Sequence, residues 1–322
     1  MLLAAGDVPG KLMIAGEYAV LRPDGVALAV AVGRLAHWQV LADGLGQLRL
    51  HAFGALHTTE LDHASAPATG LLAFAQRAVA VARSLWAHEL NHSIEISVFG
   101  DVGGKKLGLG TSAAVTVAVL RAFAPALTSA HQIAQLARQV HAAAQAGQGS
   151  GYDVTTIAFG GVVAFWPRQG QVQALGWPVD LAAAAFYTGE PAPTAPALGR
   201  CAAMAPQLPA IRRAASAVLD QWPQSGSSLL SAVQACDDAL YQAHSVRDAI
   251  FSPAVQQTRQ FLLDNQLVPR LSGAGGGDCI LGFGSATAVA GACAAWRAHG
   301  RVVAAELPAD LAVDSESIHA AI

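Results

Sequence analysis

All three lysines of this 322-residue chain lie beside glycines, whereas its other basic side chains are arginines. Lys11 follows Pro9-Gly10, and Lys105 and Lys106 stand just ahead of the segment Gly108-Leu109-Gly110-Thr111-Ser112. An ammonium group is a compact point charge that suits phosphate oxygens, and glycine loops present backbone N–H groups to the same anion. The pattern therefore predicts two loops that together bind a phosphorylated ligand.

The glycine segment at 108–113 has the spacing of a dinucleotide-binding loop but lacks the acidic partner of that loop. The fingerprint needs a carboxylate about twenty residues further on, and no aspartate or glutamate occurs between Val102 and Tyr152. A Walker loop is excluded because no Gly-Lys pair is followed by Ser or Thr at the required place. We expect a loop that opens a helix, whose free N–H groups favour a polyphosphate, with the Ser112 hydroxyl available to an accompanying Mg²⁺. A plain helix cap with packing glycines is the alternative.

The composition is that of a folded protein without general affinity for nucleic acid or membrane. Apolar residues make up 53% of the chain and charged residues 13%, and the net charge is −3. The four cysteines have no metal-binding or redox spacing, and no signal peptide is evident, which favours reduced thiols in a cytoplasmic protein. The uncharged stretch 279–296 is expected to form a buried strand and a small-residue helix, not a membrane span.

Helical and strand patterns mix without strict alternation, which favours the α+β class. Alternating apolar residues predict a half-buried strand that ends at Gly100, and a wholly apolar circumference predicts a fully buried helix at 113–123. A second helix is expected to begin at Ser129. Further predictions are strands at 161–166, 279–283 and 302–306, helical periodicity around 237–250, and a helix that ends near His299.

Three segments, in this order along the chain, resemble the motifs of the GHMP kinases. They are Pro9-Gly10-Lys11 through Gly16-Glu17-Tyr18-Ala19-Val20, then Gly108 to Ala114, then Ser272 to Asp278. Within that family the chain looks most like the phosphomevalonate kinases. Tyr18 stands where mevalonate kinases usually have a histidine, Lys105-Lys106 precede the phosphate loop, and Gly277-Asp278-Cys279 closes the third motif.

The resemblance implies a two-lobed α+β fold and a kinase that uses ATP and Mg²⁺. The N-terminal lobe, at 1–170, would be ribosomal-S5-like and carry the phosphate loop, and the C-terminal lobe, at 171–322, would be ferredoxin-like and carry the third motif. The implied partner is a small molecule, 5-phosphomevalonate, with no nucleic acid and no membrane. Both a monomer and a homodimer remain open.

The resemblance also assigns roles to residues of this chain. Lys11 would face the transferring phosphoryl group, and Asp153, in Gly149-Ser150-Gly151-Tyr152-Asp153, would be the catalytic carboxylate. ATP would be held by Lys105, Lys106, Gly108, Leu109, Gly110, Thr111, Ser112 and Ala113, and the metal by Ser112 and Asp153. The acceptor would meet Gly16, Glu17, Tyr18, Ser150, Gly151, Arg247, Ser272, Gly273, Ala274 and Gly275.

The chain departs from the family at one metal ligand. Mevalonate kinases place a magnesium-binding glutamate on the helix ahead of the catalytic aspartate, yet here that stretch has no acid. His141 is a possible substitute, but imidazole is a poor ligand for a hard cation. We expect it to be a solvated or packed histidine, so that the metal rests on Ser112, ATP oxygens, water and Asp153.

The nature of the acceptor decides what Asp153 has to do. A phosphomonoester is already largely ionised at neutral pH, because its second pKa is about 6, so this acceptor needs no general base. An acceptor with a carboxylate and a phosphate should meet several cations, and Lys105, Lys106, Arg138, His131 and Arg247 are candidates. The alternatives are mevalonate or another acceptor of the family and, in a different class, a non-catalytic nucleotide sensor.

Overall fold

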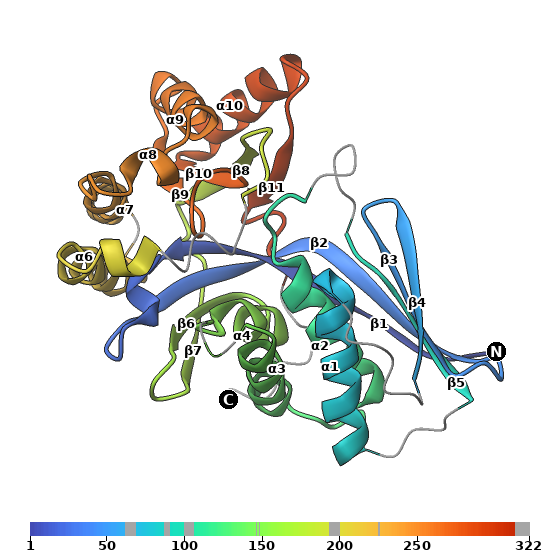
Figure 1. The fold of residues 1–322 in the computed structure, drawn as a ribbon. Coiled ribbons are helices and arrows are strands. Elements are labelled where there is room, and N and C mark those ends of the chain that lie inside the picture. Colours follow the sequence, from blue (N-terminus) through green and yellow to red (C-terminus); the bar gives the residue numbers. More distant parts are fainter. Residues whose placement is uncertain are drawn as a thin grey trace.

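The computed structural model describes residues 1–61, 69–86, 91–99, 106–145, 147, 149–192, 200–224 and 226–312 of the chain. Within these residues two β-sheets, each with its own helices, form two lobes that meet at the strands β1 (Leu2–Ala15) and β2 (Ala27–Ala42) (Figure 1). The predicted α+β class and the two-lobed architecture are confirmed.

The N-terminal lobe is built on a long antiparallel pair, β1 and β2. Within the described ranges its sheet has the order β4-β3-β5-β2-β6-β7, and β1 also pairs with β2. β3 and β5 run parallel and the other neighbours antiparallel. The remaining strands are β3 (Gln47–Ala52), β4 (Ala55–Glu60), β5 (His92–Ser97), β6 (Val162–Trp166) and β7 (Gln171–Leu175). The first half of β2 is buried on both faces, which explains its continuous apolar run Ala27–Val32.

Helices of the N-terminal lobe cover one face of this sheet (Figure 1). They are α1 (Gly70–Leu85), α2 (Thr111–Phe123), α3 (Ala130–Ala144) and α4 (Tyr152–Phe159). The central helix α2 is buried along its whole length except at Ser112, Arg121 and Ala122, as the sequence predicted. Ser129 caps α3 by accepting the N–H of Gln132, so the predicted start of this helix is also confirmed.

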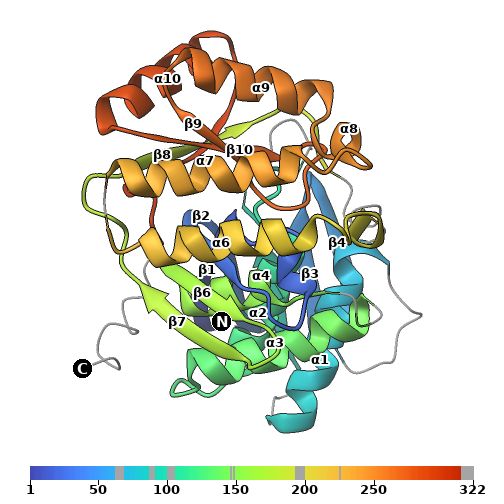
Figure 2. The same ribbon diagram turned by 90° about the vertical axis from the view of Figure 1, so that its left-hand side faces the viewer.

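The C-terminal lobe has a ferredoxin-like sheet. Its antiparallel order within the described residues is β11-β8-β10-β9, and β10 follows β9 directly, as in a split βαβ unit with additional helices. The strands are β8 (Ala182–Tyr187), β9 (Val268–Leu271), β10 (Cys279–Gly284) and β11 (Val303–Leu307). The helices are α6 (Leu208–Gln221), α7 (Ser227–Tyr241), α8 (Arg247–Ile250), α9 (Pro253–Asp264) and α10 (Ala286–Ala298), with α6 and α7 side by side in Figure 2.

Three sequence predictions need correction. The division at residue 170 falls inside the β6–β7 hairpin, so the N-terminal sheet extends to Leu175. The helical periodicity around 237–250 is split into α7 and α8, because the chain turns between Gln242 and Val246. Lys11 does not lie in a loop but inside strand β1, opposite Ala31.

The apolar stretch near the C-terminal end forms a strand and a helix, β10 and α10, as predicted. Among the described residues no helix has both the length and the apolar character that a membrane crossing needs. All four cysteines are unpaired, and only Cys201 is partly exposed.

Candidate active site

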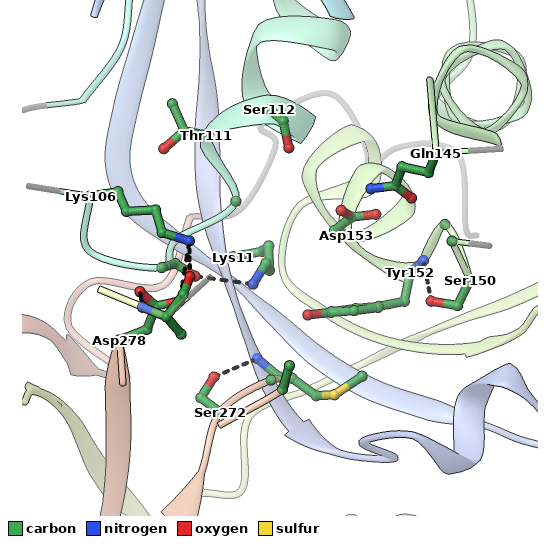
Figure 3. Close-up of a pocket in the computed structure, with 18 of the residues that line it drawn as sticks. Lys11, Lys106, Thr111, Ser112, Gln145, Ser150, Tyr152, Asp153, Ser272 and Asp278 are labelled. Carbon is green, nitrogen blue, oxygen red and sulfur yellow. Dashed lines mark hydrogen bonds and ion pairs between the residues drawn. The ribbon is translucent and has the colours of Figure 1, made fainter. Parts of the chain in front are cut away.

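A cavity of about 510 Å³ lies where the two lobes meet (Figure 3). Its wall combines β1, the glycine loop at 108–110, the first turns of α2 and α4, and the third glycine segment from the C-terminal lobe. Segments that are far apart in the sequence thus share one space. The three motifs predicted from the sequence are brought together here.

The glycine loop ends in a helix N-terminus that no side chain caps. Gly108 and Gly110 have φ of 76° and 82°, a left-handed conformation that favours glycine. Gly110 is the N-cap of α2, and Thr111 and Ser112 line the cavity. The first N–H groups of a helix have no partner within it, and the helix dipole adds positive potential. This end of the cavity can therefore bind a polyphosphate.

Lys11 lies in the centre of the site, between the glycine loop and Tyr152 (Figure 3). Its side chain is buried, and Nζ donates to the carbonyl of Gly108 at 3.1 Å and stands 5.5 Å from the centre of the Tyr152 ring. Burial alone would lower the pKa of Lys11, but Tyr152, Asp153 and Asp278 outweigh it and raise this pKa above its ordinary value. The ammonium group therefore stays charged at neutral pH.

Lys106 and Asp278 connect the glycine loop with the third motif. The Lys106 ammonium donates to the carbonyl of Ala192 and lies 3.9 Å from Oδ2 of Asp278, and the N–H of Ala192 donates to Oδ1 of Asp278. Burial raises the pKa of Asp278, and the charge of Lys106 only partly offsets this. Lys106 lines the cavity, but in this structure its charge is shared with Asp278.

Asp153 lies in the first turn of α4, behind a second left-handed glycine. The N-cap Gly151 has φ of 75° and no side chain caps this helix. The Asp153 side chain is 22% exposed, and Oδ1 accepts the N–H of Val154 at 2.9 Å. Oδ2 thus remains available to a ligand or a neighbouring donor. Carboxylate, ammonium and two uncapped helix ends face the same cavity, which is an arrangement suited to phosphoryl transfer.

The oxygen atoms around Asp153 fit a hard cation such as Mg²⁺. The Ser112 hydroxyl, the Asp153 carboxylate and the Gln145 amide all line the cavity, on the side opposite Lys106 (Figure 3). Mg²⁺ is typically held by one or two protein oxygens together with phosphate oxygens and water. Among the described residues no group of three His, Cys, Asp or Glu could hold a metal without such help. His141 does not line the cavity, so it is a packed histidine, as expected.

The other end of the cavity is closed by contacts between the lobes. The N–H of Met13 donates to Oγ of Ser272 at 3.0 Å, and the Tyr18 hydroxyl donates to the carbonyl of Ala274. Glu17 lines the cavity, but its carboxylate forms a buried ion pair with Arg270 of β9. Through Oε2 this carboxylate therefore holds the two lobes together.

Most of the residues predicted for the site line the cavity, and several do not. Those that line it are Lys11, Glu17, Tyr18, Lys106, Gly108, Gly110, Thr111, Ser112, Ser150, Gly151, Asp153, Ser272, Gly273 and Ala274. Leu109 and Ala113 are instead fully buried behind the loop. Added Cβ atoms at Gly16 and Gly275 would come within 2.1 Å of the Val26 carbonyl oxygen and 2.6 Å of the Ile250 side chain, so both shape the backbone. Lys105 lies outside the described residues.

The arginine and histidine residues that were candidates for binding the acceptor do not line the cavity. Arg247 lies on α8, where its guanidinium packs over the Tyr241 ring at 5.3 Å and does not reach the cavity. Arg138 packs over Phe165, and His131 stacks edge-on against Phe159. The prediction for Arg247 is therefore wrong, since charge alone did not show which face of the lobe it occupies.

Sequence reasoning missed other lining residues. Tyr152 and Asp278 were parts of recognised motifs and received no role, although an aromatic or acidic residue at a motif end is a usable signal. Phe53, Phe74 and Gln145 also line the cavity, and no local pattern marks them.

Comparisons with known proteins agree with this geometry. The family model for the N-terminal domain of GHMP kinases matches residues 73–161, and the model for the C-terminal domain of GHMP kinases matches residues 230–302. Together the two matches cover half of the chain. No curated protein matches the chain in sequence.

Several solved structures share the fold at low sequence identity. Streptococcus pneumoniae phosphomevalonate kinase, in complex with phosphomevalonate and AMPPNP, is 20% identical with a TM-score of 0.80, over 94% of this chain and 99% of that chain. The Lin0012 protein from Listeria innocua is 21% identical with a TM-score of 0.82, over 94% and 96%. Methanococcus jannaschii mevalonate kinase is 16% identical with a TM-score of 0.75, over 93% and 96%. With both family domains matched and the motifs gathered in one cavity, this chain belongs to the GHMP kinases.

Proposed function

We propose that this GHMP kinase transfers the γ-phosphoryl group of ATP to the phosphate of 5-phosphomevalonate, with Mg²⁺ as its metal. The observation that carries the proposal is the cavity in which Lys11, Asp153 and the uncapped end of α2 face one another. The fold of a phosphomevalonate kinase solved with phosphomevalonate and AMPPNP supports the same assignment.

The chain's own residues suit the nucleotide half of the reaction. The N–H groups from Gly110 to Ser112 would hold the phosphates of ATP, and the Lys11 ammonium would stabilise charge on the group in transfer. Ser112 and Asp153 would hold Mg²⁺, which neutralises negative charge on the phosphates. Nζ of Lys11 donates to the Gly108 carbonyl, so the ammonium group is already positioned beside the loop.

The acceptor half favours a nucleophile that needs no strong base. A phosphomonoester is largely ionised at neutral pH, since its second pKa is about 6. Asp153 can then act as a charge partner of Lys11 and of the metal. Because Arg138, His131 and Arg247 do not line the cavity, we expect the acceptor to meet Lys11 and the uncapped N-terminus of α4 with Ser150. The unpaired cysteines are consistent with a cytoplasmic location.

The decisive experiment is a coupled assay of ADP release with 5-phosphomevalonate and with mevalonate as separate acceptors. We expect turnover with the phosphorylated acceptor and little with mevalonate. Turnover of mevalonate alone would refute the choice of acceptor and would give Asp153 the role of a general base for a hydroxyl. Binding of Mg-AMPPNP without turnover of either compound would favour a non-catalytic nucleotide sensor.

A further inference from the structure

His141 lies directly behind Asp153 and has no conventional hydrogen-bond partner. It occupies the last turn of α3, its side chain is 2% exposed, and its Nδ1 atom lies 3.6 Å from Oδ2 of Asp153. Among the described residues neither ring nitrogen forms a hydrogen bond. The ring packs against Phe74, with 4.8 Å between ring centroids, and Phe74 in turn lines the cavity.

An imidazole buried in this way needs an explanation, because unsatisfied buried polar atoms destabilise a fold. The Asp153 carboxylate is the neighbour that supplies one. If Nδ1 presented its lone pair to Oδ2, two acceptors would face each other, so Nδ1 is the nitrogen that carries the hydrogen. Only a small side-chain rotation separates 3.6 Å from an ordinary hydrogen bond of about 2.9 Å.

The same geometry argues against His141 as a metal ligand. The ring does not line the cavity, whereas Phe74, which packs against the ring, does. A hard cation also prefers oxygen atoms, which Ser112, Gln145 and Asp153 offer at the cavity wall. His141 therefore acts on the site through Asp153.

We propose that His141 is a positioning residue whose Nδ1–H holds Oδ2 of Asp153 while the N–H of Val154 holds Oδ1. With both oxygens restrained from behind, the remaining lone pairs of the carboxylate point into the cavity, where Lys11 and a bound metal would meet them. An imidazole N–H provides this restraint without adding a second negative charge beside Asp153. The inference rests on the proposed function only in that Asp153 serves the nucleotide site.

The test compares His141→Phe, which keeps the ring packing, with His141→Asn, which keeps a donor near Nδ1. Each is made in the unaltered protein and in Asp153→Asn. The readouts are the Kd of Mg-AMPPNP by calorimetry, the kcat and KM with 5-phosphomevalonate, and the thermal midpoint without ligand. A hydrogen bond to a charged group is worth about 1.5 kcal/mol or more, which corresponds to about tenfold.

We expect His141→Phe to weaken Mg-AMPPNP binding and lower kcat about tenfold, with little change in the acceptor KM. His141→Asn should recover most of both values. In the Asp153→Asn background, His141→Phe should change the Kd less than about twofold, because the partner of the bond is already altered.

Equal losses with and without the Asp153 carboxylate would overturn the proposal, as would an Asn variant as poor as the Phe variant. The thermal midpoints measured without ligand provide a test that does not depend on the reaction. If the two side chains interact, the double variant should lose less than the sum of the losses of the two single variants, and if they are independent the losses should add. If the unaltered protein turned over a different acceptor, the calorimetric cycle would still decide the role of His141. If the unaltered protein bound no Mg-AMPPNP, the kinase proposal would fail. The midpoints would then still test His141, because additive losses would refute its contact with Asp153.

Discussion

A single methyl group at Gly108 should separate the two motifs that meet at one end of the cavity, the glycine loop and the third motif. An added Cβ at this position would lie 2.4 Å from Cβ and 2.5 Å from Cγ of Asp278. Ordinary contact begins at 3.4 Å, so the glycine loop and the third motif must move apart by about 1 Å. Gly108 also has φ of 76°, which an L side chain rarely adopts.

Both effects can be given magnitudes. The left-handed backbone should destabilise Gly108→Ala by about 1–2 kcal/mol, and the overpacking by about 1–3 kcal/mol more. A displacement of about 1 Å at a phosphoryl-transfer site can reduce the rate about 100-fold. We therefore expect kcat/KM to fall about 100-fold and the Kd of Mg-AMPPNP to rise about tenfold or more, a change of about 1.4 kcal/mol.

Two further variants separate backbone strain from collision. Gly44 has φ of 79° and nothing within 4 Å of an added Cβ, so Gly44→Ala carries the strain without the contact. It should lower the free energy of unfolding by about 1–2 kcal/mol and leave nucleotide binding unchanged. Asp278→Gly removes the obstructing Cβ, and in this background Gly108→Ala should cost no more than Gly44→Ala does.

The measurements are urea unfolding for stability, calorimetry with Mg-AMPPNP, and the coupled assay of ADP release. If Gly108→Ala bound Mg-AMPPNP as tightly as the unaltered protein, the glycine loop would not be the phosphate site. If Asp278→Gly failed to relieve its effect, the contact between the two motifs would not be what positions the loop.

Three other changes have defined outcomes. Lys11→Met keeps the volume of a buried side chain and removes the charge, so kcat should fall about 100- to 1000-fold while the thermal midpoint hardly changes. Arg270→Met should lower the free energy of unfolding by about 3–5 kcal/mol, because the buried Glu17 loses its partner, and Glu17→Gln in addition should recover part of this loss in urea unfolding. Burial raises the folded-state pKa of Asp278 above its unfolded value, so its stabilising contribution is present at low pH and is lost as pH rises through the folded pKa. Asparagine also tolerates the left-handed backbone at this position, so Asp278→Asn should fold. Between pH 4 and neutral pH its free energy of unfolding should fall less than that of the unaltered protein. An identical pH dependence of the two proteins would contradict this reasoning.

Elements with local signals could be predicted from the sequence. Three such signals depend only on neighbouring residues, and the structure has their elements where they were predicted. They are the apolar circumference of α2, the Ser129 cap of α3 and the strand–helix–strand order at the C-terminal end. The glycine loop at 108–110 and the helix after it could be predicted for the same reason, since they are consecutive in the chain.

Contacts between distant segments could not be predicted. Glu17 and Arg270 are separated by 253 residues. The residues around each of them do not show that the two side chains will form an ion pair. Lys11 was expected in a loop because it stands beside a glycine, yet it pairs with β2, and the strand has an irregularity between Val8 and Gly10. Arg247 carried the right charge, but only the turn before α8 decides that it points to Tyr241.

Strand β1 sets the spacing between the two ends of the cavity. Lys11 and Met13 are two residues apart, so their side chains leave the strand on the same face, and both line the cavity. At Lys11 the strand holds the glycine loop, because the N–H of Lys11 donates to the Leu109 carbonyl at 2.8 Å, and at Met13 it holds the third motif through Ser272. A rigid strand therefore fixes the distance from the glycine loop to the third motif, and a change in strand register, not in either loop, would be needed to alter that distance.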